Sequence, residues 1–238
     1  GPIVNSVNPK KRRNSIPVKR DWNNIDEKVV AQLAKGDVRI LSSSYPSDHS
    51  QKLMSSFVSK FGGKQVTWDA FSTETLREGQ KISYGQSVVP YYHFNRSKVT
   101  VSIDADFLGT YLSPTQFTKS FGEGRNPEGT MSRLISFHTM PSLTTLNADD
   151  NYSIKPSQQL GVALGLLNVV LAKQGKKLPS TVAPHALSDA QLGLADGTLN
   201  QVAQYLVNNS GESLVIAGGM TTENANGLNL QIAVNWLN

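Results

Sequence analysis

The 238-residue chain contains no cysteine. This absence excludes disulfides, iron–sulfur ligation, thiolate zinc sites and cysteine nucleophiles within the chain, and it leaves the redox compartment open. Histidine is scarce too, and no two histidines stand at metal-ligand spacing. The four are His49, His93, His138 and His185. We therefore expect neither a metal site nor cysteine-based catalysis.

Long hydrophobic runs are also missing. No stretch approaches the roughly 20 apolar residues that a membrane helix requires, and no signal-peptide pattern opens the sequence. The G-x-S-x-G elbow, the Walker lysine and the H-E-x-x-H pattern are absent as well, so the sequence offers no recognised catalytic motif. The length suits one large α/β domain or two packed lobes with a substantial core.

Acidic residues are absent from the first 20 positions, which hold six cations: Lys10, Lys11, Arg12, Arg13, Lys19 and Arg20. The remaining chain holds 17 Lys and Arg against 18 Asp and Glu, so its net charge is −1 although the whole chain carries +5. A nucleic-acid surface would be folded, with aromatic residues between its charges. We interpret residues 1–20 as an extended, solvated basic arm and expect no nucleic-acid partner. Docking of this arm on an acidic partner or an anionic membrane surface is the alternative.

The stretch Lys98–Phe117 has the pattern of a buried strand that leads into a ligand-binding loop. Its β-branched run, residues 98–103, ends at Asp104 and Asp106, and Ser113-Pro114 then predicts a helix start. In open α/β sheets, ligands bind at such carboxyl ends of strands. Further strands are predicted at 38–41, 65–68, 134–137 and 214–217, and helices at 24–35, 48–61, 73–83, 158–172, 199–207 and 224–237. This alternation predicts an α/β fold with a mostly parallel sheet.

Two small clusters near strand ends are candidates for chemistry. Asp104 and Asp106 could act as an acid–base pair or a magnesium site, but no partner residue can be placed beside them. Turn formation and hydrogen bonding to loop amides explain them more simply. Gly218-Gly219 could cradle a phosphate but lacks the three-glycine spacing of dinucleotide sites, which favours a tight strand-to-helix turn.

Several segments together resemble the molybdopterin oxidoreductase superfamily. More closely, they resemble the cofactor-free domain of the large iron–sulfur subunit of bacterial alternative complex III, a quinol:electron-acceptor oxidoreductase. The likeness runs from about Pro17 to Asn238, and its clearest parts read VSIDADFLGTYLSPTQF and MSRLISFHTMPSLTTLNADDNYSIKPSQQ. The resemblance implies a Rossmann-like α/β fold with mostly parallel sheets flanked by helices and two intimately packed lobes.

The cofactor contacts of that superfamily are altered in this chain. Its Gly-x-Asn-Pro, Asp-Pro-Arg and Pro-Gly-Thr-Asp segments correspond here to residues 104–107, 137–140 and 156–159. Carboxylates facing a pyrophosphate would repel it by about 1 kcal/mol or more per close pair. The resemblance thus implies no catalytic residue and no metal site, with molybdopterin guanine dinucleotide as the alternative cofactor. It leaves a vestigial cleft lined by Asp104, Asp106, His138, Gln159, Gly218 and Gly219.

The resemblance also implies a layout and a role. One lobe would comprise residues 21–70 and 185–238, and the other residues 71–184, with the central strand 98–103. We expect one non-catalytic structural domain of a longer respiratory electron-transfer subunit. Its partners would be the cluster-bearing C-terminal domain of the same polypeptide and other subunits. The domain would be periplasmic and would be associated with the membrane only through these partner subunits. The alternatives are a true cofactor-binding oxidoreductase domain and an interaction module that acts through the arm.

Overall fold

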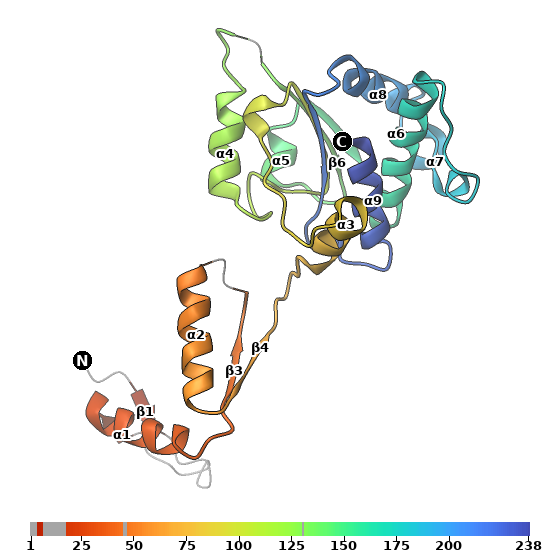
Figure 1. Cartoon of the computed structure of the whole chain (residues 1–238). Coiled ribbons are helices and arrows are strands. Elements are labelled where there is room, and N and C mark those ends of the chain that lie inside the picture. The colour runs from red at the N-terminus through yellow and green to blue at the C-terminus, as the bar shows by residue number, and fades with distance from the viewer. Residues whose placement is uncertain (1–3, 7–17, 45–46, 130) are drawn as a thin grey trace. The chain divides into compact units, whose positions relative to one another are not determined.

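The computed structural model describes residues 4–6, 18–44, 47–129 and 131–238, and Figure 1 shows its helices and strands. The chain divides into two compact units, residues 1–70 and residues 71–238. No helix among the described residues is long and apolar enough to cross a membrane.

The first unit is built around a short parallel strand pair. Its elements are β1 (Val4–Ser6), β2 (Val18–Arg20), α1 (Trp22–Leu33), β3 (Arg39–Ser42), α2 (Asp48–Lys60) and β4 (Lys64–Thr67). β1 pairs with β2 in antiparallel fashion, and β3 pairs with β4 in parallel through the α2 crossover. The Asp21 side chain caps α1 at the Asn24 amide, and the helix begins two residues before the predicted start at residue 24. Neither α1 nor α2 buries a side chain fully.

The expected basic arm overlaps β1 and β2. Residues 1–3 and 7–17, and with them the cations at 10–13, lie outside the described residues. The remaining two cations of the arm, Lys19 and Arg20, belong to β2.

The second unit holds the main sheet and its flanking helices. Its strands are β5 (Val99–Ile103), β6 (Arg133–His138), β7 (Asp150–Ser153) and β8 (Ser213–Ala217). Its α-helices are α3 (Glu74–Tyr84), α4 (Pro114–Glu123), α5 (Leu143–Leu146), α6 (Gln159–Lys173), α7 (Asp189–Leu192), α8 (Thr198–Asn208) and α9 (Gly227–Leu237). Its 3-10 helices are η2 (Phe94–Arg96), η3 (Pro156–Gln158), η4 (Ala183–His185) and η5 (Met220–Thr222).

The four strands are parallel and ordered β7-β6-β5-β8. In register, Val101 of β5 stands between Ile135 of β6 and Val215 of β8. The chain moves outward from β5 to β6 and β7, then crosses to the other side of β5 for β8. The strand order therefore reverses between β5 and β8, which is the switch point where open α/β sheets bind ligands. The chain has the α/β, Rossmann-like fold expected from its sequence.

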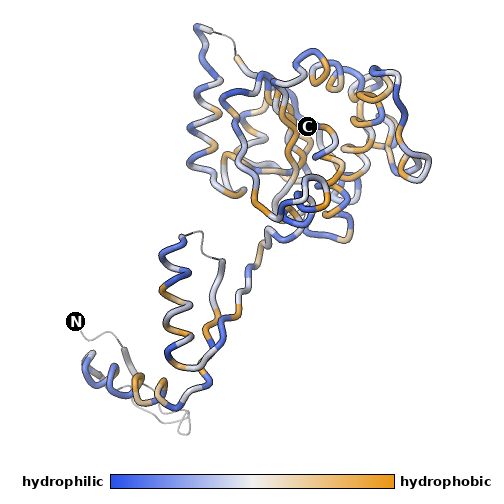
Figure 2. The backbone as a smooth tube through the Cα atoms, in the orientation of Figure 1, coloured by the Kyte–Doolittle hydropathy of each residue, from blue (hydrophilic) through white to orange (hydrophobic). Residues whose placement is uncertain are grey.

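Apolar side chains cover both faces of this sheet. On one face of the sheet, a cluster of buried side chains from β5, β6 and β8 packs against α6, α8 and α9, and it includes Val101, Phe137 and Leu166. On the opposite face, Phe94 stacks on Phe107 and packs with α4. Figure 2 shows the hydrophobic residues gathered along the central strands. The all-buried pattern of β5 is typical of a parallel strand covered on both sides.

The arrangement of β8 differs from the expected lobes. The family resemblance implies a lobe that groups residues 185–238 with residues 21–70. In the structure, β8 pairs with β5 along its whole length, and residues 185–238 belong to the same compact unit as residues 71–184. Backbone pairing in one sheet is the physical reason for this grouping, because a strand must satisfy its hydrogen bonds beside a neighbour.

Candidate functional site

Asp104 follows the last residue of β5 and binds two other segments through one carboxylate. Its Oδ1 accepts hydrogen bonds from the Thr139 amide at 2.7 Å and the Thr139 hydroxyl at 3.1 Å. Its Oδ2 accepts one from Gln159 Nε2. The Asp104 backbone is left-handed, with φ 55°, a conformation that Asp and Asn tolerate better than most residues. Both carboxylate oxygens are thus engaged within the fold.

Gln159 extends these bonds to the segment after β8. It is the first residue of α6 and is only 2% exposed. Its Nε2 also donates to Thr221 Oγ1 at 3.0 Å, and its Oε1 accepts from Asn224 Nδ2 at 3.3 Å. We call these five residues the Asp104 network: Asp104, Thr139, Gln159, Thr221 and Asn224. The network joins the carboxyl ends of β5, β6 and β8 to the start of α6.

Gly218 and Gly219 provide the close approach that this junction needs. A Cβ on Gly218 would lie 2.1 Å from a ring carbon of Tyr111, and Tyr111 donates its hydroxyl to the Ala217 carbonyl at 3.1 Å. Gly219 has φ 98° and lies against the Asp104 carbonyl, where a Cβ would be 3.1 Å away. The glycines therefore admit an aromatic ring and a backbone turn into η5, as the tight-turn interpretation predicts.

The buried Tyr111 and the partly buried Tyr92 adjoin this turn as neutral phenols. Burial, reinforced by the neighbouring Tyr92, raises the pKa of Tyr111 well above its ordinary value. Burial is also the main reason that the pKa of Tyr92 rises to about 12. Neither side chain carries charge at neutral pH, so the Tyr111 ring acts here as a packed aromatic group.

Asp106 stabilises a different segment. Its Oδ1 accepts from the Thr144 amide and hydroxyl, each at 3.0 Å, and its Oδ2 accepts from Thr110 at 3.2 Å. Its carbonyl accepts from the amides of Gly109, Thr110 and Tyr111. Asp104 and Asp106 thus organise separate loops and do not share a partner.

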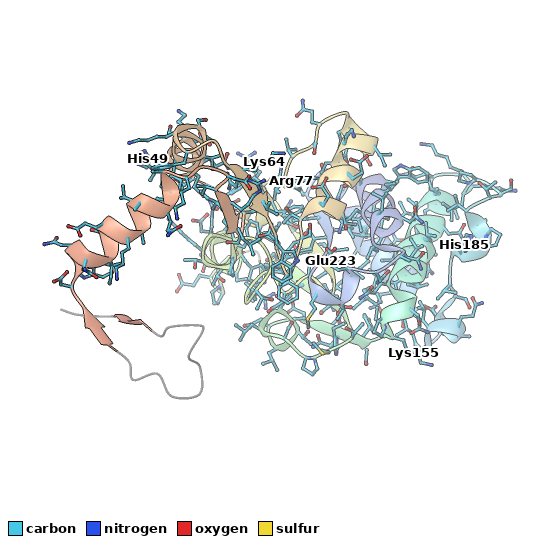
Figure 3. The ribbon with its side chains drawn as sticks, turned by 90° about the horizontal axis from the view of Figure 1, so that it is seen from below. His49, Lys64, Arg77, Lys155, His185 and Glu223 are labelled. Atoms are coloured by element: carbon cyan, nitrogen blue, oxygen red, sulfur yellow. The ribbon has the colours of Figure 1, made fainter. Side chains whose placement is uncertain are left out.

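His138, the last residue of β6, is half-buried, and its Nδ1 is one of the buried polar atoms without a hydrogen-bond partner among the described residues. Of the six residues predicted to line the cleft, the structure brings four together through the Asp104 network and the Gly218-Gly219 turn. Asp106 and His138 lie at neighbouring strand ends with other contacts. Glu223, labelled in Figure 3, follows η5 and accepts from Thr75 at 3.2 Å.

Sequence reasoning did not identify four residues of this junction: Thr139, Thr221, Asn224 and Tyr111. Thr139 lies in the segment 137–140 that the resemblance singles out, but nothing marks its side chain as a donor. Thr221 in η5 and Asn224 are polar residues with no spacing signal. Tyr111 falls inside the segment that carries the family resemblance, so its position could have suggested a role.

Among the described residues, no group of three or more His, Asp or Glu could hold a metal ion. An apolar cavity of about 260 Å³ lies elsewhere, between α6, η4 and α9, and its lining includes Trp236 and His185. Figure 3 labels His185.

Comparison with known proteins bears on the fold. No protein-family model matches the chain. No curated protein sequence matches it significantly. Among solved structures, the chain is similar to acetylene hydratase from Pelobacter acetylenicus, with a TM-score of 0.64 and 15% sequence identity. The match covers 94% of this chain and 33% of that chain, so this chain spans about a third of its length. At this identity the likeness concerns the fold alone: the chain shares the fold of the matching third of acetylene hydratase.

Proposed function

We propose that this chain is a non-catalytic structural domain of a respiratory, quinol-oxidising electron-transfer subunit, derived from a molybdopterin oxidoreductase fold and working without the molybdenum cofactor. The respiratory role rests on the sequence resemblance to the iron–sulfur subunit of alternative complex III. The absence of cofactor binding rests on the Asp104 network.

The engagement of Asp104 is the observation that carries the proposal. A dinucleotide at the switch point would present anionic phosphates to backbone amides and side-chain donors at the strand ends. Here the Thr139 amide and the Gln159 amide group donate to the Asp104 carboxylate instead. A phosphate at this position would lose those donors and would meet a negative charge, and both effects weaken binding.

The Tyr111 ring supports the same conclusion on the β8 side of the junction. It packs where a Cβ of Gly218 would be, and its hydroxyl is held by the Ala217 carbonyl. Bound phosphates approach a glycine turn through open space over the backbone. With the ring over Gly218, the residues at this junction do not fit an anionic dinucleotide.

Elemental and pterin analysis of the natural protein tests the proposal. The protein is purified from its own cells under non-denaturing conditions, and molybdenum, tungsten and released pterin are measured per mole of chain. We expect far less than one equivalent of each. A stoichiometric metal together with a guanine-containing pterin would instead establish the alternative, a cofactor-binding oxidoreductase domain.

A further inference from the structure

β8 lies at one edge of the sheet, but three of its outward backbone groups are occupied: the Val215 amide, the Val215 carbonyl and the Ala217 carbonyl. The Gly218 amide donates to the Ile103 carbonyl, so even-numbered residues of β8 face β5 and odd-numbered residues face away from it. On the outward side, the Val215 amide donates to Asn238 Oδ1 and the Val215 carbonyl accepts from Asn238 Nδ2, each at 2.8 Å. One asparagine side chain thus makes the pair of bonds that a neighbouring strand would make.

At the next outward position, Ala217, the carbonyl is also occupied. The Ala217 carbonyl accepts from Gln231 Nε2 at 2.9 Å and from the Tyr111 hydroxyl at 3.1 Å. Asn238 and Gln231 both come from the α9 segment, which packs beside β8. Side chains of one helical segment therefore follow the strand edge.

These side chains are held in place by their surroundings. Asn238 Nδ2 also donates to the Val234 carbonyl at 3.1 Å, and Gln231 is 4% exposed. Helix α3 packs against Gln231 at Gly79, and a Cβ added to Gly79 would lie 2.7 Å from the Gln231 Cβ. Gln231 is buried, whereas Asn238 is exposed and is oriented by its bond to Val234. Because both amide groups are oriented, the bonds to β8 need little ordering when they form.

The sequence of β8 explains why its edge requires protection. The strand reads SLVIA, without charge or proline and with two β-branched residues. Such segments pair readily with other strands when an edge is open. The opposite edge strand, β7, reads DNYS, and its Asp150 binds Arg133 at 2.7 Å. A short polar strand discourages pairing through its composition, whereas β8 has no such feature.

We propose that Asn238, Gln231 and Tyr111 form an edge lock that keeps β8 from accepting a further strand. The strand that the edge lock excludes is β8 of a second copy of this chain, which would otherwise pair edge to edge with this β8. Identical β8 edges can satisfy each other across a two-fold axis, and the outward groups of Val215 then bond to the partner copy.

The test compares Asn238→Ala with wild type and with Asn229→Ala, an exposed asparagine on the same helix. Circular dichroism first establishes that each variant is folded. Hydrogen exchange then measures the Val215 amide, and light scattering measures mass as concentration rises. We expect exchange of the Val215 amide to be roughly tenfold faster in Asn238→Ala alone. We also expect Asn238→Ala to gain mass beyond wild type, Gln231→Leu to gain less, and Asn229→Ala to gain none.

A second substitution distinguishes edge pairing from general exposure of the core. Ser213→Pro removes an outward amide at the first residue of β8, where proline is tolerated in edge strands. In the Asn238→Ala background it should restore the wild-type mass. The edge lock is refuted if the Val215 amide exchanges no faster in Asn238→Ala. It is equally refuted if the opened variant keeps the mass of wild type, or if association persists with Ser213→Pro.

Discussion

Asp104 connects three chain segments through one carboxylate, in a backbone conformation that few residues tolerate. Asp104→Ala removes all three side-chain bonds and leaves an alanine at positive φ. We expect it to lower the free energy of unfolding by about 2–4 kcal/mol, because Gln159 and the Thr139 amide lose a charged acceptor. Asp104→Asn keeps an oxygen for Thr139 and tolerates the backbone, so it should cost about half as much. Urea unfolding measures both, and equal losses would contradict a role for the carboxylate.

Asp149 makes the stability of the fold depend on pH. Arg125 approaches it at 2.7 and 3.0 Å, and the Leu134 amide donates at 2.8 Å. Burial alone would raise the pKa of Asp149, but the Arg125 and Leu134 bonds and the nearby arginine charges outweigh it, so the pKa lies below the ordinary 3.8. A lowered native pKa stabilises the fold above the unfolded-state pKa, and this stabilisation is lost as pH falls through the native value.

Asp149→Asn should therefore flatten the acid side of the stability curve. At pH 7 we expect a loss of about 1–2 kcal/mol, since a charge-assisted acceptor is replaced by a neutral one. Below about pH 4 the difference from wild type should shrink, because the wild-type carboxyl becomes protonated there. Chemical unfolding across this pH range measures the difference. A gap that stays constant with pH would show that the charge of Asp149 contributes nothing.

At the scale of elements, α6 provides much of the core on one face of the sheet. Leu166 on α6 is fully buried, whereas Leu146 on α5 is 76% exposed. Leu166→Ala should cost about 2–5 kcal/mol through lost burial and the cavity left behind. Leu146→Ala, the matched control, should change stability by less than about 0.5 kcal/mol. Thermal unfolding of the two variants measures this, and similar losses would contradict the position of α6 in the core.

The strong elements could be predicted from the sequence because their patterns are local. The buried run of β5 and the apolar α6 are continuous in sequence, and the structure has them within a residue or two of the predicted bounds. β7 and α5 were not predicted, since β7 is a polar edge strand and α5 is a single turn. Their formation depends on pairing with β6 and on the cap that Ser142 provides, and neither has a periodic signal.

The site was predictable only in part, for a related reason. Carboxyl ends of parallel strands meet at one edge, so Asp104, Gln159 and the Gly218-Gly219 turn could be expected near one another. Which donors the Asp104 carboxylate would find depends on loop conformations after β6 and β8. Thr139 lies in the segment 137–140 that the resemblance singles out, but nothing marks its side chain as the donor, and Thr221 in η5 has no pattern that marks it.

For the whole molecule, the two units differ in what holds them together. Both apolar clusters and the four-stranded sheet lie within residues 71–238. In residues 1–70, neither α1 nor α2 has a fully buried side chain. A chain of residues 71–238 should therefore unfold in one cooperative transition, whereas residues 1–70 alone should show none, because a fold needs a buried core to offset its lost chain entropy. Calorimetry of the two pieces checks this, and a cooperative transition in residues 1–70 would contradict it.

A titration of the whole chain with GDP, followed by thermal unfolding, tests most directly whether the switch point has lost its affinity for a nucleotide. If the chain has a GDP site, GDP at about 100 times the dissociation constant of that site would stabilise the fold by about 2.7 kcal/mol. This stabilisation would raise the unfolding temperature by several degrees. We predict no change in the unfolding temperature up to millimolar GDP. A saturable rise that disappears in Gly218→Ala would show that the junction still binds a guanine nucleotide.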